Sequence, residues 1–203
     1  MKYGPSIWDK RYSSDEFVYG KEPNSFLEQN VNIIPKGKIL CVADGEGRNG
    51  VYLAKLGYDV TSIDFAPQAL EKTKLLAKEN NVTVTTICAD LLEFDFSENE
   101  YNGIISIYSH FNIDDTIELH KKYYDALKSE GVFFIEAFAK EQLPLKSGGP
   151  KDINLLYNID GIEKSFPNGK FVMLKKDIIY LHEGELHDGK AIVVRAIVRK
   201  PSI

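Results

Sequence analysis

Short apolar runs alternate with helical patterns along most of the chain past residue 37. The runs at 38–43, 59–63, 82–87, 103–107 and 132–137 read as strands, and the first is apolar enough to be buried on both faces. Strands that alternate with helices are typical of a mostly parallel sheet covered by helices. The order of these segments therefore predicts an α/β fold with a doubly wound sheet.

Three helical patterns lie between these runs. The segment from Arg48 to Leu56 ends before Gly57, and glycine commonly terminates helices. Pro67 suits the first turn of the next helix. The apolar stripe of that helix, by the 3, 4, 7 spacing, is Ala69, Leu70, Thr73, Leu76 and Ala77. The third helix, with Asp114 or Asp115 as its N-cap, has a predicted inner stripe of Ile113, Ile117, His120, Tyr124 and Leu127.

The pattern changes after residue 137. Residues 143–152 are rich in proline and glycine and read as a loop, which a weakly helical stretch follows to about residue 163. Two long strand-like segments, 171–182 and 191–199, flank a turn at 184–189 and predict a terminal hairpin. Residues 1–36 form a polar, aromatic-rich arm ahead of the sheet.

Composition argues against several classes of protein. A length of 203 residues with 43% hydrophobic content suits one domain with a substantial core. The net charge is −5 and no basic cluster is dense, which argues against nucleic acid as a partner. No apolar run is as long as a membrane span, and the first residues lack the apolar core of a signal peptide. We therefore expect a cytoplasmic protein without a membrane partner, as a monomer or a homodimer.

The two cysteines, Cys41 and Cys88, both lie in apolar strand-like runs. Cysteine in such a run is usually a small buried residue. The pair predicts neither a disulfide framework nor a zinc site, and no metal is expected.

The first strand leads into a glycine-rich loop, Gly45-Glu46-Gly47-Arg48-Asn49-Gly50, which opens a helix. In an open α/β sheet, ligands bind at this position, beyond the carboxyl ends of the strands. The same glycine spacing occurs in dinucleotide-binding enzymes, so the pattern alone does not identify the ligand.

The charge of the loop distinguishes two ligands. Asp44 and Glu46 lie where a pyrophosphate would have to sit, and like unit charges ~4 Å apart repel by ~4 kcal/mol at an effective dielectric constant of ~20. S-adenosylmethionine has no phosphate, and its sulfonium and α-ammonium groups are cations that an acidic loop attracts. Arg48 could pair with the α-carboxylate of this cofactor, and its alternative is a plain solvent-exposed arginine. The loop therefore predicts S-adenosylmethionine as cofactor and S-adenosylhomocysteine as product.

Two further acids follow neighbouring strands. Asp64 ends the second strand, 64 − 45 = 19 residues beyond Gly45, where an acidic residue meets the ribose hydroxyls of an adenosine ligand. The alternative for Asp64 is an N-cap of the following helix. Asp90 follows the third strand and could accept from the adenine amino group, with Phe65 and Leu91 as apolar walls.

With these residues in place, the chain resembles the class I S-adenosylmethionine-dependent methyltransferases, and among them a small tellurite-resistance-like group. The matching segments are Trp8 to Tyr12 (WDKRY), Tyr19 to Leu27 (YGKEPNSFL), Ala43 to Gly50 (ADGEGRNG), Ser62 to Asp64 (SID) and Glu183 to Ala191 (EGELHDGKA). The resemblance implies a Rossmann-like seven-stranded sheet whose final strand runs antiparallel. It also implies that the arm closes over the methionine end of the cofactor through Tyr12 and Tyr19. Cys41 and Ala43 stand where the family usually has an acid and the first glycine of a triplet.

The predicted site combines the arm, the loop and the strand ends. The predicted cofactor-binding residues are Tyr12, Tyr19, Asp44, Gly45, Glu46, Gly47, Arg48, Asn49, Asp64, Phe65, Asp90, Leu91 and Tyr108. One methyltransferase domain is expected over 1–203, with a cofactor-covering arm at 1–36, a cofactor-binding core at 38–137, and a substrate-side loop and terminal hairpin at 138–203.

The substrate side is less defined. Candidates beside the methyl group are Tyr19 and the residues past the fourth strand, Tyr108, His110 and Phe111. We interpret His110 as a residue that caps a strand end, and His120 as a satisfied core residue. His187 matches a position that the resembled group uses on the substrate side, and its alternative is a polar residue at a hairpin tip. We predict His187 and Tyr19 as catalytic residues and residues 147–152 as a lid or substrate rim.

Methyl transfer from a sulfonium is an in-line displacement, for which the protein supplies alignment. A soft nucleophile such as a thiolate or a reduced metalloid needs little further help, whereas an oxygen or amine nucleophile needs a base. The sequence therefore predicts methyl transfer to a small-molecule acceptor, either a thiol or metalloid or another metabolite. Two alternatives stay open, an NAD(P)-dependent oxidoreductase and a non-catalytic S-adenosylmethionine-binding module.

Overall fold

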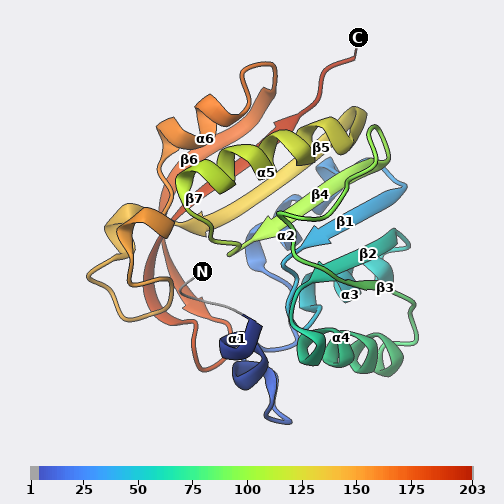
Figure 1. Cartoon of the computed structure of the whole chain (residues 1–203), viewed down its shortest axis with the longest axis vertical. Coiled ribbons are helices and arrows are strands. Elements are labelled where there is room, and N and C mark those ends of the chain that lie inside the picture. Colours follow the sequence, from blue (N-terminus) through green and yellow to red (C-terminus); the bar gives the residue numbers. More distant parts are fainter. Residues whose placement is uncertain (1–4, 203) are drawn as a thin grey trace.

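The computed structural model describes residues 5–202, so the first four residues of the predicted arm and Ile203 lie outside the described residues. Within that range, seven strands form one sheet in the order β3-β2-β1-β4-β5-β7-β6 (Figure 1). They are β1 (Lys38–Val42), β2 (Asp59–Asp64), β3 (Thr85–Cys88), β4 (Tyr101–Ile107), β5 (Leu127–Phe138), β6 (Lys170–His182) and β7 (Asp188–Arg199). Strands β1 to β5 pair in parallel, and β7 runs antiparallel to β5 and β6. This confirms the predicted Rossmann-like sheet with its antiparallel C-terminal hairpin strand.

Helices cover both faces of the sheet (Figure 1). They are α1 (Pro5–Tyr12), α2 (Ser25–Asn30), α3 (Arg48–Lys55), α4 (Pro67–Glu79), α5 (Ile113–Ala126) and α6 (Ile159–Ser165), with short 3-10 turns at Val31–Ile33, Lys140–Gln142 and Ile153–Leu155. One apolar cluster joins α2, α3 and α4 to the sheet, and a second joins α5 and α6 to the other face. The parallel strands are apolar on both faces, so each face needs such a cover.

The predicted stripe of α4 is confirmed. Its members, Ala69, Leu70, Thr73, Leu76 and Ala77, are all buried, and Pro67 lies in the first turn. Because the stripe faces the sheet, α4 holds the chain after β2 in place beside the glycine-rich loop.

The predicted inner face of α5 is only partly correct, since His120 and Leu127 of the predicted stripe are buried but the two isoleucines are not. Ile113 and Ile117 are 55% and 47% exposed, whereas Leu119 and Tyr123 are buried. Tyr123 packs against Phe133 of β5 with ring centroids 5.6 Å apart, and this contact fixes the rotation of the helix. A shift of the buried stripe by one residue corresponds to a rotation of the helix about its own axis by about 100°.

Several local boundaries also differ from the prediction. Helix α5 is capped by Asn112, whose side chain accepts from the N–H groups of Asp114 and Asp115, so neither aspartate is the N-cap. The strand predicted from residue 82 begins three residues later because Val82 still donates to a carbonyl of α4.

Cys88 is exposed because β3 is an edge strand, while Cys41 is buried as predicted.

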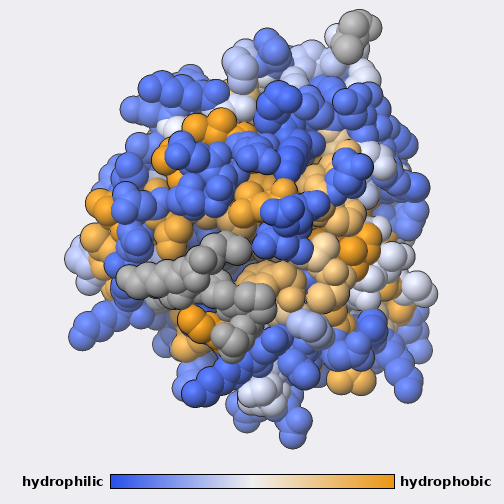
Figure 2. Space-filling model, in the orientation of Figure 1, coloured by the Kyte–Doolittle hydropathy of each residue, from blue (hydrophilic) through white to orange (hydrophobic). Residues whose placement is uncertain are grey.

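The carboxyl ends of β1 and β4 point toward the same region beside α1 (Figure 1). Figure 2 shows hydrophobic residues surfacing across the middle of this face, within a mostly hydrophilic exterior. Among residues 5–202, none of the helices combines the length and apolar character that crossing a bilayer requires.

Candidate functional site

The loop after β1 needs its glycines for close packing. Gly47 is the N-cap of α3 with φ +82°, and a Cβ there would lie 2.4 Å from Cγ2 of Thr73. A Cβ on Gly50 would lie 2.5 Å from Oγ of Ser62, so this glycine lets α3 approach β2. Ala43 has φ +49°, a left-handed conformation that favours glycine. The family that the sequence resembles usually has glycine at this position.

The two acids of the loop are both engaged within the protein. Oγ of Ser62 donates to Oδ2 of Asp44 at 2.6 Å. Burial, together with nearby Asp64, raises the pKa of Asp44 to about 7, although the hydrogen bond from Ser62 lowers it. Glu46 is buried, pairs with Nζ of Lys72 at 2.8 Å and accepts from the N–H of Tyr19 at 3.4 Å. The loop therefore carries less free negative charge than its sequence indicates, and cofactor binding by these two side chains stays a prediction.

Asp64 holds the loop at the end of β2. Its Oδ2 accepts from the N–H of Gly45 at 2.9 Å, and its Oδ1 accepts from the N–H of Ala66 at 2.9 Å. The N-cap of α4 is Ala66, so the alternative assignment of Asp64 as that cap is wrong. A carboxylate oxygen accepts more than one hydrogen bond, so Asp64 keeps capacity for ligand hydroxyls.

The predicted adenine side lies beside the ends of β2 and β3. Phe65 is half-buried and Leu91 is buried. Asp90 is half-buried, and its Oδ1 accepts from the N–H of Leu92 at 3.0 Å. Their contact with an adenine ring stays a prediction.

The arm closes over the loop from outside. Tyr12 of α1 is buried, and a Cβ on Gly45 would lie 3.0 Å from its hydroxyl. Oδ1 of Asp9 is buried without a hydrogen-bond partner among the residues that the structure describes. Burial raises the pKa of Asp64, and the carboxylate of Asp9 raises it further. An unpaired carboxylate oxygen here suits a ligand that is cationic or donates hydrogen bonds.

Four aromatic rings, those of Tyr19, Tyr108, Phe138 and His187, form what we call the cage. The ring centroid of His187 lies 4.6 Å from those of Tyr19 and Tyr108 and 5.3 Å from that of Phe138. Tyr108 directly follows β4 with φ +56°, which is strained for a bulky residue and is typical of functional sites. The structure thus brings together the two predicted catalytic residues, Tyr19 and His187.

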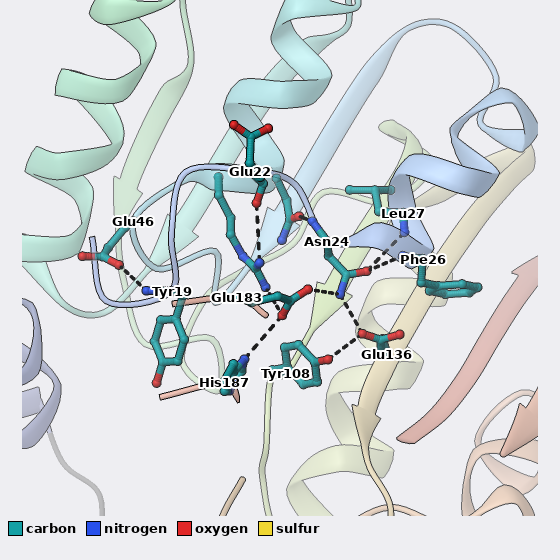
Figure 3. Close-up of polar contacts among 12 residues, drawn as sticks. Tyr19, Glu22, Asn24, Phe26, Leu27, Glu46, Tyr108, Glu136, Glu183 and His187 are labelled. Atoms are coloured by element: carbon teal, nitrogen blue, oxygen red, sulfur yellow. Dashed lines mark hydrogen bonds and ion pairs between the residues drawn. The ribbon is translucent and has the colours of Figure 1, made fainter. Parts of the chain in front are cut away.

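A buried carboxylate, Glu136 at the end of β5, supports one side of the cage (Figure 3). Its Oε1 accepts from the hydroxyl of Tyr108 at 2.7 Å and from Nδ2 of Asn24 at 2.6 Å. Its Oε2 accepts from Nε of Arg195 at 2.5 Å, and Arg195 also pairs with Asp177 at 3.2 Å. The carboxylate of Glu136 therefore links the arm, the end of β4 and strand β7 through hydrogen bonds and an ion pair.

A second carboxylate, Glu183 in the hairpin turn, supports the other side (Figure 3). Its Oε2 pairs with Nη2 of Arg48 at 2.9 Å, and its Oε1 accepts from Nδ2 of Asn24 at 3.2 Å. Arg48 is thus engaged by the hairpin in this structure. Asn49 is engaged by the arm, since its Oδ1 accepts from the N–H of Asn24 at 2.9 Å.

Two other histidines lie outside the cage. Nδ1 of His110 lies 2.8 Å from the carbonyl oxygen of Leu155, and burial lowers the pKa of His110 to about 4, which agrees with its interpretation as a structural residue. His120 is a core residue as expected, but its Nδ1 has no hydrogen-bond partner within residues 5–202, so the expectation that it is satisfied is wrong.

The loop predicted as a rim borders the cage. A Cβ on Gly148 would lie 2.7 Å from Cδ2 of His187 and 3.0 Å from Cζ of Phe138. Nε2 of Gln142 donates to Oγ of Ser147 at 3.0 Å and so anchors the start of the loop. Movement of this loop as a lid stays a prediction.

Sequence reasoning missed four residues of the site, Asn24, Glu136, Glu183 and Arg195. Glu136 and Arg195 had a local signal, because each is a single charge inside an apolar run, that of β5 and that of β7. The other two, Asn24 and Glu183, lie in polar stretches, where a charged or amide side chain is ordinary.

The central part of the chain is similar to known methyltransferases. Residues 39–131 match the family model described as methyltransferase domain. The Bacillus subtilis protein YbaJ, an uncharacterized methyltransferase, is 26% identical over 96 residues, which cover 47% of this chain and 38% of that protein. The Haemophilus influenzae protein TehB, a probable S-adenosyl-L-methionine-dependent methyltransferase, is 35% identical over 74 residues, which cover 36% of this chain and 26% of that protein. The chain thus spans well under half the length of these two relatives.

Solved structures extend the likeness to the whole fold. The crystal structure of TehB from Haemophilus influenzae has a TM-score of 0.73 at 20% identity and covers 97% of this chain and 66% of its own. A structure from work on the conversion of a disulfide bond into a thioacetal group during echinomycin biosynthesis has a TM-score of 0.81 at 14% identity and covers 98% of this chain and 92% of its own. The family model covers just under half of this chain, and the relatives and the strand order agree with it, so residues 39–131 are similar to S-adenosylmethionine-dependent methyltransferase domains.

Proposed function

We propose that this chain transfers the methyl group of S-adenosylmethionine to a small acceptor that binds against the rings of the cage. The observation that carries the proposal is a row of rings from the glycine-rich loop to the cage. A Cβ on Gly45 would lie 3.0 Å from the hydroxyl of Tyr12. The ring centroid of Tyr19 lies 6.4 Å from that of Tyr12 and 4.6 Å from that of His187. A cofactor held on the loop would therefore have aromatic side chains beside its methionine end.

The residues around the loop fit this cofactor. Asp64 has acceptor capacity for ribose hydroxyls, and the unpartnered Oδ1 of Asp9 suits a cationic or hydrogen-bond-donating group. Phe65, Asp90 and Leu91 would enclose the adenine. When bound, the cofactor supplies an activated methyl group on a sulfonium. Arg48 could reach the α-carboxylate only by giving up its ion pair with Glu183.

Tyr19 and His187 are proposed to align the reactants. The faces of aromatic rings attract cations, so the cage favours a sulfonium at its edge. Burial lowers the pKa of His187, which Glu183 opposes, so the ring is neutral at pH 7 and does not repel a cationic cofactor. Alignment of the acceptor with the methyl group is the main contribution that an in-line displacement requires.

The acceptor is proposed to be a small molecule with a soft nucleophile, a thiol or a metalloid, or another metabolite. The support is the cage itself, in which His187 is buried and its neighbours are at least half-buried. A macromolecular acceptor would need an open surface at this place.

Two measurements test the proposal. Thermal unfolding with S-adenosylmethionine, S-adenosylhomocysteine or NADH identifies the cofactor, since a ligand at 100 times its dissociation constant adds about 2.7 kcal/mol to stability. We expect a raised melting temperature with the first two only. Release of S-adenosylhomocysteine is then measured with a panel of thiols, metalloid oxyanions and amines. Stabilisation by NADH alone would favour an oxidoreductase, and binding without turnover of any acceptor would favour a non-catalytic module.

A further inference from the structure

The ring of His187 carries an unusual buried polar atom. The residue is only 6% exposed, and its Nδ1 has no hydrogen-bond partner among the residues described. Oε2 of Glu183 lies 3.5 Å from this nitrogen, slightly beyond a normal hydrogen bond (Figure 3). A buried donor or acceptor left unpaired is costly, so this pair needs an explanation.

Glu183 is held at this distance by two other groups. Arg48 pairs with the same oxygen at 2.9 Å, and Asn24 donates to the other oxygen at 3.2 Å. Burial alone would raise the pKa of Glu183, but His187 and Arg48 beside it lower the pKa to about 2. The carboxylate is therefore ionised, and an ionised carboxylate only accepts hydrogen bonds.

The tautomer of His187 follows from this contact. Because Nδ1 faces a group that only accepts, the neutral ring is favoured with its proton on Nδ1 and its lone pair on Nε2. A carboxylate behind an imidazole holds the tautomer and stabilises the ring when it takes up a proton. Glu183 and His187 thus have the chemistry of a proton-accepting pair.

The charges around the ring restrict the acceptor. The charged groups closest to His187 are Glu183, Arg48 and Glu136, and its other titratable neighbours are Tyr19, Tyr108 and His110. Arg48 is paired with Glu183, Glu136 is paired with Arg195, and Arg11 donates to the hydroxyl of Tyr19 at 2.9 Å. Arg48, the cation that acts on His187, is thus neutralised by Glu183, and burial of an oxyanion next to this ring would be costly in desolvation.

On the basis of the proposed function, we propose that Glu183 is the positioning residue of a Glu183–His187 pair that accepts the proton of a neutral thiol. In the transfer, the acceptor's sulfur–carbon bond forms as the bond between the methyl group and the sulfonium sulfur breaks. The thiol proton moves to Nε2 of His187, and the products are a methyl thioether and S-adenosylhomocysteine. The imidazolium returns its proton to water. Atoms and charge balance without a further reactant.

The first test uses the unmodified, cofactor-free protein. Nitrogen NMR of the histidine rings at neutral pH, with His187 assigned by comparison with His187→Gln, reports which ring nitrogen carries the proton. We expect the Nδ1-protonated tautomer, and an Nε2-protonated ring would overturn the pair. This result does not depend on methyl transfer, so it separates failure of the pair from failure of the proposed function.

The second test compares Glu183→Gln with Glu185→Gln, a matched change at an exposed position of the same turn. We expect Glu183→Gln to lower kcat/KM for a small thiol by about tenfold to a hundredfold and to shift the acidic limb of the pH profile to lower pH. Because Glu183→Gln also frees Arg48 from its ion pair, affinity for S-adenosylmethionine should not fall, so a lower kcat/KM is not explained by lost cofactor binding. Glu185→Gln should match the wild type. Identical pH profiles for the two variants would overturn the positioning role.

A third comparison tests the acceptor class. Wild-type protein is supplied with small thiols and, separately, with selenite and tellurite, and release of S-adenosylhomocysteine is measured. Turnover of thiols supports the proposal. Turnover of the oxyanions alone would refute a neutral thiol acceptor but leave methyl transfer in place. Failure of the wild type to bind S-adenosylmethionine would refute the proposed function, while the NMR result still decides the proton-accepting pair.

Discussion

Replacement of His120 by phenylalanine tests how burial controls charge in this fold. The ring is 2% exposed, with centroids 5.5 Å from Phe133 and 5.0 Å from Phe166. Burial lowers the pKa of His120 to about 3, compared with about 6.5 in an unfolded chain. Below pH ~6.5 this histidine therefore binds a proton in the unfolded chain but stays neutral in the folded chain. The wild type should lose stability as the pH falls through this range.

The expected magnitude follows from the two pKa values. One such group costs about 1.4 kcal/mol per pH unit, so lowering the pH from 7 to 5 should cost the wild type about 2 kcal/mol through this ring. His120→Phe removes that loss and also removes the unpaired Nδ1, whose burial costs about 1–3 kcal/mol. His110 contributes equally to both proteins and cancels in the comparison.

Urea denaturation at pH 7 and pH 5 measures this difference. The free energy of unfolding of His120→Phe relative to wild type should rise by about 2 kcal/mol between the two pH values. At pH 7 the variant can be more or less stable than the wild type, depending on how well the core accommodates the larger phenylalanine ring. The change of this stability difference with pH is therefore the decisive quantity. Parallel loss of stability in the two proteins would refute the assignment of a neutral buried ring.

Four further substitutions test the site and its scaffold. Asp64→Ala should weaken S-adenosylmethionine binding tenfold or more by calorimetry and lower the melting temperature, since two backbone N–H groups lose their acceptor; unchanged affinity in the folded variant would remove the ribose assignment. His187→Ala should lower turnover with cofactor affinity intact, and undiminished turnover of a true substrate would exclude it from the site. Gly47→Ala should lower the free energy of unfolding by about 2 kcal/mol or more because of its φ of +82° and the contact with Thr73; wild-type stability in urea would contradict this. Ala43→Gly should raise the free energy of unfolding by about 1 kcal/mol, because φ is +49° at this position. A lower free energy of unfolding in the same urea assay would count against backbone strain at Ala43.

The sequence alone predicted the parts of the fold that depend on local pattern. The α4 stripe, the buried β1 and the terminal hairpin all follow from hydrophobic periodicity, since each element has to bury its own apolar face. The position of the ligand loop followed in the same way, because it lies at the end of the first parallel strand. The rotation of α5 did not follow, because two stripes one residue apart were both apolar enough, and packing of Tyr123 on Phe133 decided between them.

The charges at the site were decided by the tertiary structure. Asp44 and Glu46 looked like a free acidic loop, but Ser62 and Lys72 arrive from other elements and engage both side chains. Glu136 and its partner Asn24 are 112 positions apart in the sequence, and Glu183 and its partner Arg48 are 135 positions apart. No local sequence pattern could therefore predict either contact.

The physical reason for this division is the difference between apolar and polar burial. An apolar side chain is stabilised by leaving water whatever its neighbour is, so its pattern along the chain is informative by itself. A buried carboxylate or imidazole is tolerated only with a specific partner at hydrogen-bond distance, and that partner is supplied by the fold. For this chain the sequence therefore determined the sheet, its helices and the place where a ligand binds, whereas only the tertiary structure decided which charges remain there and placed Glu183 behind His187.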